Sequence, residues 1–370
     1  MRIVMFYHSL ISDWNHGNAH FLRGIASELL SRGHEVLVYE PSDGWSLRSL
    51  IAEQGRAAVD RFHAAFPELR STLYDPATLD LDGALDRADL VLVHEWNSHD
   101  LVRRIGQHRA RAGRYRLLFH DTHHRSVTDP AAMSQYDLTH YDGVLAYGQV
   151  LRDLYLSRGW TAQAWTWHEA ADTRRFRPIE AAREGDLIWI GNWGDDERTE
   201  ELQTFLLEPV KALGLSARVH GVRYPEAGLA ALAAAGITYA GWVPNDRVPE
   251  RFARFRVTVH IPRRPYTRAL PGIPTIRPFE ALACGIPLVS APWEDTEGLF
   301  TPGADFLVAR TGEEMKRHLR MLLHDASAAQ ELARHGRATI LARHTCAHRV
   351  DQLLEINASL TLPEKKEVPA

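Results

Sequence analysis

The sequence alternates short apolar runs, each suited to one β-strand, with longer stretches whose apolar residues recur at helical spacing. The first run is 3–6, and the stretch 19–32 that follows places Phe21, Ile25 and Leu29 on one helical face. Strands joined by helices pair in parallel, because the helix carries the chain back to the edge where the first strand began. The alternation therefore predicts an α/β fold with parallel sheets.

The alternation runs through the first half of the chain and begins again in the second half. Further strands are expected at 35–39, 90–94, 115–119 and 143–146, and then at 187–190, 217–220, 238–239, 257–260 and 288–289. Helices are expected at 46–66, 200–213, 312–324, 326–343 and 346–360. This repetition predicts two Rossmann-like domains, in which ligands bind beyond the carboxyl ends of the strands.

The composition is that of a globular protein and excludes several other classes. The 370 residues are 45% apolar and 24% charged, which suits two domains. A formal charge of −4 gives no general attraction to nucleic acid or to acidic membranes. No stretch has the roughly 18 apolar residues of a membrane span, and the first residues lack the pattern of a signal peptide. With two cysteines, a disulfide framework is excluded, so we expect a cytoplasmic protein.

The segment 275–290 combines a short helical pattern, a glycine turn at Gly285 and an apolar strand. The helix carries Arg277 and Glu280, which we expect near its head. Helix N-termini attract phosphate, and a carboxylate offers two acceptor oxygens to a ribose diol. The segment therefore predicts a nucleotide-sugar site.

The loop before the first long helix contains Gly17 and Asn18. Glycine lets the backbone approach a ligand, so one interpretation is a contact with a diphosphate or donor sugar near Gly17. The other is a plain strand-to-helix turn with Asn18 as the N-cap. The loop has no G-x-G-x-x-G pattern, which argues against a nicotinamide dinucleotide site.

Three loops of the second half carry further candidates. In the run 191–199, Gly191 and Asn192 precede Arg198, which could pair with a diphosphate, although the neighbouring acids favour a helix start instead. The backbone at Trp242 and Val243 could read a base edge. The basic run with Arg263, Arg264 and Arg268 fits either a phosphate-facing loop or a solvated face.

The run 119–126 in the first half concentrates titratable side chains just past a strand. His120, Asp121 and His123 could act in acid–base catalysis, because histidine titrates near neutral pH and a carboxylate can orient it. Metal binding and structural hydrogen bonding within the loop are the alternatives, and the rest of the sequence offers no matching second cluster of ligands. The arginine-rich stretch 103–116 fits a solvated helix or a surface for an anionic acceptor.

Three runs resemble the GT-B glycosyltransferases, and most closely the family-4-like and spore-maturation-type branch. They are GNAHFLRGIASELLSRGHEV, EAADTRRFRP and FEALACGIPLVS. The resemblance covers most of the chain and implies two Rossmann-like domains that face each other across a cleft. It implies an acceptor-side domain at 1–175, a donor domain at 176–345, and a crossover helix followed by a disordered tail at 346–370.

The resemblance also implies roles for individual residues. Glu280 would bind the ribose hydroxyls, Arg277 and Arg263 would lie near the diphosphate, and His120 would contact the donor sugar. Where many relatives carry a second acid in an E-x7-E pattern, this chain has Gly272. We expect the missing contact to come either from backbone groups of the turn from Gly272 to Thr275 or from another side chain.

The resulting prediction is a metal-independent glycosyltransferase that uses a nucleotide diphosphate sugar, with UDP as the expected nucleotide, and needs no cofactor. Its acceptor, its sugar, its stereochemical outcome and its oligomeric state are open; a nucleic-acid partner is not favoured, although modified nucleic acid stays among the open acceptors. The alternatives are a sugar-nucleotide epimerase of similar fold and a non-catalytic protein that binds a sugar nucleotide or a glycan.

Overall fold

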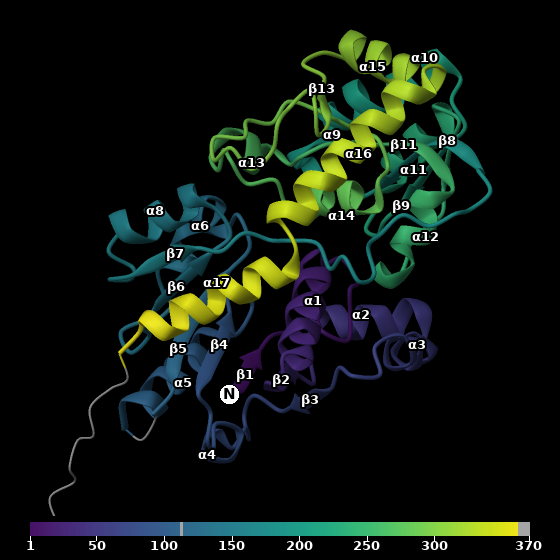
Figure 1. Ribbon diagram of the computed structural model, residues 1–370. Coiled ribbons are helices and arrows are strands. Elements are labelled where there is room, and N and C mark those ends of the chain that lie inside the picture. The colour runs from purple at the N-terminus through teal and green to yellow at the C-terminus, as the bar shows by residue number, and fades with distance from the viewer. Residues whose placement is uncertain (112–113, 362–370) are drawn as a thin grey trace, which may run out of the picture. The chain divides into compact units, whose positions relative to one another are not determined.

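The computed structural model describes residues 1–111 and 114–361. They form two compact units, which we describe one at a time. The first unit comprises 1–12, 25–168 and the chain from 347 onward, and the second comprises 13–24 and 169–346. Each unit is a parallel sheet with helices on its faces, which confirms the predicted α/β class (Figure 1).

The first unit contains a seven-stranded parallel sheet in the order β3-β2-β1-β4-β5-β6-β7. Its strands are β1 (Arg2–Phe6), β2 (Glu35–Pro41), β3 (Ser71–Tyr74), β4 (Leu90–His94), β5 (Arg116–Asp121), β6 (Gly143–Ala146) and β7 (Ala164–Thr166). Every residue of β4 is buried, as expected for a central strand that is covered on both faces. The expected strands 90–94 and 143–146 are confirmed.

The helices of the first unit are α1 (Asn18–Ser31), α2 (Trp45–Gln54), α3 (Ala57–Ala65), α4 (Leu81–Ala84), α5 (His99–Arg111), α6 (Arg125–Thr128), α7 (Pro130–Met133), α8 (Gln149–Ser157) and α17 (Cys346–Ser359). Helix α1 begins within the second unit and ends within the first. From residue 347 onward α17 belongs to the first unit, where Trp167 donates its Nε1–H to the Arg349 carbonyl at 2.8 Å. The tail from 362, expected to be disordered, lies outside the described residues.

The second unit contains a six-stranded sheet in the order β10-β9-β8-β11-β12-β13, again parallel throughout. Its strands are β8 (Gly185–Ile190), β9 (Ala217–His220), β10 (Ile237–Tyr239), β11 (Phe255–His260), β12 (Leu288–Ser290) and β13 (Leu307–Val308). Side chains of β8 alternate between two cores: Leu187 and Trp189 join one, and Ile188 and Ile190 join the other.

Helices and single turns cover both faces of this sheet. They are η1 (Asp195–Glu197), α9 (Thr199–Leu202), the π-helical η2 (Gln203–Leu207), α10 (Glu208–Leu213), α11 (Glu226–Ala234), η3 (Asn245–Arg247), α12 (Val248–Ala253), α13 (Arg264–Arg268), α14 (Ile276–Cys284), α15 (Gly312–His324) and α16 (Ala326–Arg343). The expected bounds of α15 and α16 are confirmed, because side-chain caps set their starts: Thr311 accepts from the Glu314 N–H at 3.2 Å, and Asp325 from the Ala328 N–H at 3.0 Å. Among the described residues, no helix has the length and apolar character needed to cross a membrane.

Candidate functional site

Each sheet has one place where the strand order changes direction. In the first unit it lies between β1 and β4, and in the second between β8 and β11. At such a switch point the connections leave toward opposite sides, and the crevice between them is the usual ligand site of an open parallel sheet. The loops after β8 and β11 contain the candidates Gly191, Asn192, Arg198 and Arg263, so the predicted donor residues of those loops come together at the switch point of the second unit.

Arg198 holds these two loops together. Its Nη1 donates to the Ile261 carbonyl at 2.8 Å and its Nε to the Trp193 carbonyl at 3.3 Å, while Nη2 donates to the Asn192 carbonyl. The guanidinium lies 5.1 Å from the centre of the Trp189 ring. Arg198 thus binds backbone carbonyls rather than carboxylates, so it fixes the loops and leaves its positive charge at the switch point.

Three guanidinium groups make this place electropositive. Burial, followed by the charge of Arg263, lowers the pKa of Arg198 to about 9, and Arg277 adds to the effect. Arg263 is paired with Glu197 at 3.0 Å, and Arg277 is paired with Glu280. Like charges this close repel one another, and an anion relieves that repulsion. Guanidinium groups match phosphate oxygens in geometry, so a diphosphate suits the site.

Glu280 is fully buried within α14, one turn after Arg277, rather than at the head of the helix. Its Oε1 accepts a hydrogen bond from Asn245 Nδ2 at 2.7 Å and lies 3.2 Å from His20 Nδ1, while Oε2 pairs with Arg277. Burial opposes ionisation, but the charge of Arg277 and the bonds from His20 and Asn245 hold the pKa of Glu280 below its usual value. The carboxylate is therefore charged and fixed in one orientation.

The segment 13–24 of the second unit reaches the same place. Asp13 accepts hydrogen bonds from Trp242 Nε1 at 3.1 Å and from the Asn245 N–H at 2.9 Å, and it pairs with Arg23 at 2.8 Å. The candidate base-reading loop at Trp242 is thus held by a carboxylate. Val243 follows in that loop and packs against one of the two cores.

Gly191 and Asn192 form the start of the loop after β8. The Gly191 N–H donates to the His220 carbonyl at 2.9 Å. Asn192 uses both ends of its amide, because Oδ1 accepts from the Val222 N–H at 2.9 Å and Nδ2 contacts Asn15 Oδ1. These contacts fix the loop backbone beside the arginine group.

Close packing and backbone strain mark the turn before α14. A Cβ at Gly17 would lie 2.8 Å from Cγ2 of Ile276, so this approach requires glycine. Asn18 is the first residue of α1. Thr275 has a φ of 55°, a strained value for a residue with a side chain, and Gly272 has a φ of 90°. The first N–H groups of α14 have no partner within the helix, so the turn supplies backbone donors where the sugar contact is expected.

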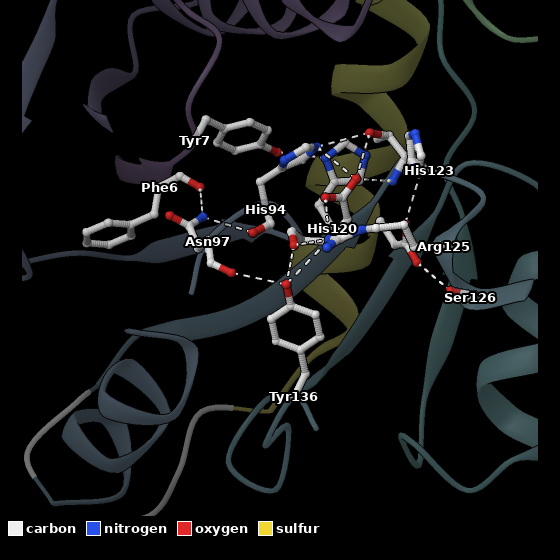
Figure 2. A network of polar contacts seen from close by, with 12 residues as sticks. Phe6, Tyr7, His94, Asn97, His120, His123, Arg125, Ser126 and Tyr136 are labelled. Atoms are coloured by element: carbon white, nitrogen blue, oxygen red, sulfur yellow. Dashed lines mark hydrogen bonds and ion pairs between the residues drawn. The ribbon is translucent and has the colours of Figure 1, made fainter. Parts of the chain in front are cut away.

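The candidate acid–base residues of the first unit lie at the carboxyl end of β5, where His120 and Asp121 are the last two residues of the strand and His123 follows it (Figure 2). The Nδ1 of the fully buried His120 is 2.8 Å from the Tyr7 hydroxyl. The His94 ring stacks on Tyr7 with centroids 4.8 Å apart, and its Nε2 lies 3.0 Å from Thr122 Oγ1. Burial lowers the pKa of His120 to about 3. At physiological pH the ring is therefore neutral and can exchange hydrogen bonds without carrying charge.

Asp121 is occupied by donors of its own unit. Its Oδ1 accepts from the His123 N–H at 3.0 Å, and its Oδ2 accepts from Ser126 Oγ at 2.9 Å and from the Tyr155 hydroxyl at 2.8 Å. Burial raises the pKa of Asp121, against the effect of these donors. The carboxylate braces its loop, and the catalytic roles of Asp121 and His123 stay predictions. The His123 ring packs edge-on against Trp96 at 5.3 Å.

Side-chain contacts also fix the loop after β4. Arg125 pairs with the buried Glu95 at 3.2 Å and lies 4.3 Å from the centre of the Trp96 ring. The Tyr136 hydroxyl donates to the Asn97 carbonyl at 3.1 Å, and Figure 2 shows it meeting Arg125 at the same loop. Over 1–111 and 114–361, no group of three or more histidine, cysteine, aspartate or glutamate side chains is arranged to hold a metal ion.

Sequence patterns did not single out several residues that build the second unit's site. His20 and Asn245 contact Glu280, and Asp13 accepts from the Asn245 N–H, although all three lie far from Glu280 in the sequence. His260 ends β11 at the switch point itself. The only pattern that could have pointed to His260 is a titratable residue at the end of an apolar strand.

Comparisons with known proteins agree with this architecture. Residues 198–355 match the family model for glycosyl transferase-like proteins. Sucrose-phosphate synthase from Thermosynechococcus elongatus has a similar structure, with 14% identity, a TM-score of 0.64, and coverage of 97% of this chain and 98% of that one. HepE of Anabaena, solved with UDP-glucose, has 14% identity and a TM-score of 0.63, with coverage of 97% of this chain and 100% of that one. An alpha-glucosyltransferase solved with UDP and DNA has 12% identity and a TM-score of 0.68, with the same two coverages. A search of curated protein sequences found no match.

The chain therefore has the GT-B fold, with Rossmann-like parallel sheets in both units. Its sequence from 198 to 355, which includes the arginine group and Glu280, matches the model for glycosyl transferase-like proteins. The resemblance to GT-B glycosyltransferases read from three sequence runs is confirmed.

Proposed function

We propose that the protein transfers a sugar from a UDP-sugar to an acceptor and that it needs no metal ion. The arginine group at the switch point of the second unit carries this proposal. Arg198, Arg263 and Arg277 would stabilise the leaving diphosphate as its negative charge develops. Glu280 would accept hydrogen bonds from the ribose, and the backbone at Trp242 and Val243 would contact the base.

The choice of UDP rests on the similar structures. HepE was solved with UDP-glucose and the alpha-glucosyltransferase with UDP, and both have the fold of this chain. On the first unit, His120 would contact the sugar or move a proton, with Asp121 and His123 holding its loop. Both cysteines are buried free thiols, in keeping with the cytoplasmic location that we propose.

A ligand screen followed by turnover measurements tests the proposal. A ligand that binds only the folded protein raises its melting temperature, so UDP and UDP-sugars should do so and other nucleotides should not. Turnover of the selected UDP-sugar with acceptor mixtures should transfer the sugar in the presence of EDTA. A sugar isomer formed without acceptor would identify an epimerase, and binding without any turnover would identify a non-catalytic protein.

Removing the Glu280 carboxylate tests the ribose contact. We expect Glu280→Ala to lower UDP affinity at least about tenfold, the effect of one to two lost hydrogen bonds to a charged group. Glu280→Gln, which keeps the shape and one acceptor, should show a smaller loss and report whether Glu280→Ala has merely damaged the packing. Glu294→Ala changes an exposed glutamate of the same unit and serves as the control. Unchanged UDP affinity of Glu280→Ala by calorimetry would remove Glu280 from the site.

A further inference from the structure

His260 ends β11, at the switch point where we place the donor. The side chain is only 4% exposed. It pairs in register with Ser290, the last residue of β12, and its Nδ1 lies 3.0 Å from Ser290 Oγ. The neighbouring strand on its other side is β8, whose loop carries Arg198. His260 is therefore the last residue of one of the two strands, β8 and β11, that frame the crevice.

The hydrogen bonds of Ser290 determine which ring nitrogen of His260 carries the proton. Ser290 Oγ lies 2.8 Å from the Ala291 carbonyl, and a carbonyl can only accept, so the single hydroxyl hydrogen is used there. The contact between Ser290 Oγ and His260 Nδ1 then requires the histidine to donate. A neutral imidazole has one N–H, so Nε2 of His260 is left as a bare acceptor.

The ring stays neutral because of its surroundings. Burial, together with the positive charges of Arg198 and Arg277, lowers the pKa of His260 to about 3. The Nε2 atom is buried, and within the described residues nothing donates a hydrogen bond to it. A buried acceptor without a donor is costly, so this atom is suited to a ligand that supplies one.

The position also decides what kind of group can meet Nε2. Phosphate oxygens carry no hydrogen at neutral pH and would repel its lone pair, so the anion belongs to the arginine group. A neutral hydroxyl attached close to that anion is the group that can donate. We propose that Nε2 of His260 accepts a hydrogen bond from a hydroxyl of the transferred sugar, and that Ser290 positions the ring for it. This inference rests on the proposed function, because it takes the anion to be the diphosphate of a sugar nucleotide.

His220 offers a matched control. It ends β9, is also 4% exposed, and its Nδ1–H faces the Gly241 carbonyl at 3.3 Å, so its buried Nε2 is a bare acceptor too. However, β9 lies outside the pair of strands that frames the switch point, and the arginines near His220 are Arg251 and Arg218. A general effect of losing a buried histidine would appear in both variants.

Calorimetric titrations with UDP and UDP-glucose test the contact. We expect His260→Phe to weaken UDP-glucose binding about tenfold, as for one lost hydrogen bond, with UDP affinity unchanged within about twofold. His260→Gln places an amide oxygen near the position of Nε2 and should restore much of the loss. His220→Phe should leave the ratio of the two affinities unchanged.

Other outcomes separate the failure of this inference from that of the proposed function. Equal losses for UDP and UDP-glucose, or no loss for either, would overturn the sugar contact while leaving the donor site in place. A wild-type protein that binds neither ligand would overturn the proposed function and this inference with it. Nitrogen-15 NMR of the histidine rings checks the positioning role: we expect the Nδ1–H tautomer for His260 and its loss in Ser290→Ala. An Nε2–H tautomer in the wild type would refute the assignment.

Discussion

Glu169, at the start of the main part of the second unit, should make the stability of the protein depend on pH. The side chain is 6% exposed. Burial, followed by the negative charge of Glu280, raises the pKa of Glu169 from 4.5 to about 8, with Arg277 acting in the opposite direction. The folded protein therefore keeps a proton on Glu169 at pH values where the unfolded chain has released it.

The sign of the effect follows from proton binding. Between about pH 4.5 and pH 8 the folded state binds one proton more than the unfolded state, so stability falls as the pH rises through this window. Each tenfold change in a proton-binding constant is worth about 1.4 kcal/mol. The raised pKa of Glu169 thus makes up to about 5 kcal/mol of the folding free energy depend on pH.

Glu169→Gln removes the titrating group and keeps its shape. We expect the variant to melt near the wild type at pH 5 and well above it at pH 8. Calorimetric unfolding in buffers of different ionisation enthalpy should show the wild type releasing about one more proton than the variant near pH 6.5. This count does not depend on two-state unfolding of a chain with two units. Equal proton release by both proteins would refute the reasoning.

Two further substitutions test the packing described above. Gly17→Ala would place a methyl group against Ile276 and should destabilise the protein by about 1 to 3 kcal/mol in urea, whereas Gly106→Ala, with 3.4 Å to its nearest neighbour, should change little; similar midpoints for both variants would contradict the close contact. Asp305 accepts from the Thr301 N–H, His335 Nδ1 and Thr339 Oγ1 at 2.7, 2.6 and 2.7 Å. Asp305→Ala should therefore cost about 2 to 4 kcal/mol, measured by thermal melting, and a cost below about 1 kcal/mol would show that these bonds contribute little.

Central strands could be predicted from the sequence because their own side chains form the core. Strand β4 is an unbroken buried run, and its bounds agree with the expectation. The edge strands β3, β7 and β13 could not be predicted in this way. They have four, three and two residues and are largely half-buried or exposed, so pairing with a neighbour's backbone defines them rather than an apolar pattern.

Part of the candidate site could also be predicted, because some of its residues lie in recognisable local patterns. Arg198 lies in a loop, and Arg277 and Glu280 lie in the short helix α14; the local pattern of both segments suggests anion or ribose binding. The residues that orient them could not be read locally, because Asp13 and His20 reach Asn245 and Glu280 only through long-range folding. Nε2 of His260 lacks a hydrogen because Nδ1 donates to the hydroxyl of Ser290, thirty residues later in the chain. No sequence pattern shows which of these two groups donates.

The division of the chain between the two units limits how the units can be produced as separate fragments. The second unit borrows 13–24 from the N-terminal part, and the first unit takes back the residues after 346. A single cut at 168 would therefore yield two fragments, each without a segment that the other one carries. The N-terminal fragment would lack α17, and the C-terminal fragment would lack Asp13 and His20, the supports of Trp242 and Glu280. Neither unit can be produced intact by a single truncation, and the donor site requires residues from both sides of such a cut.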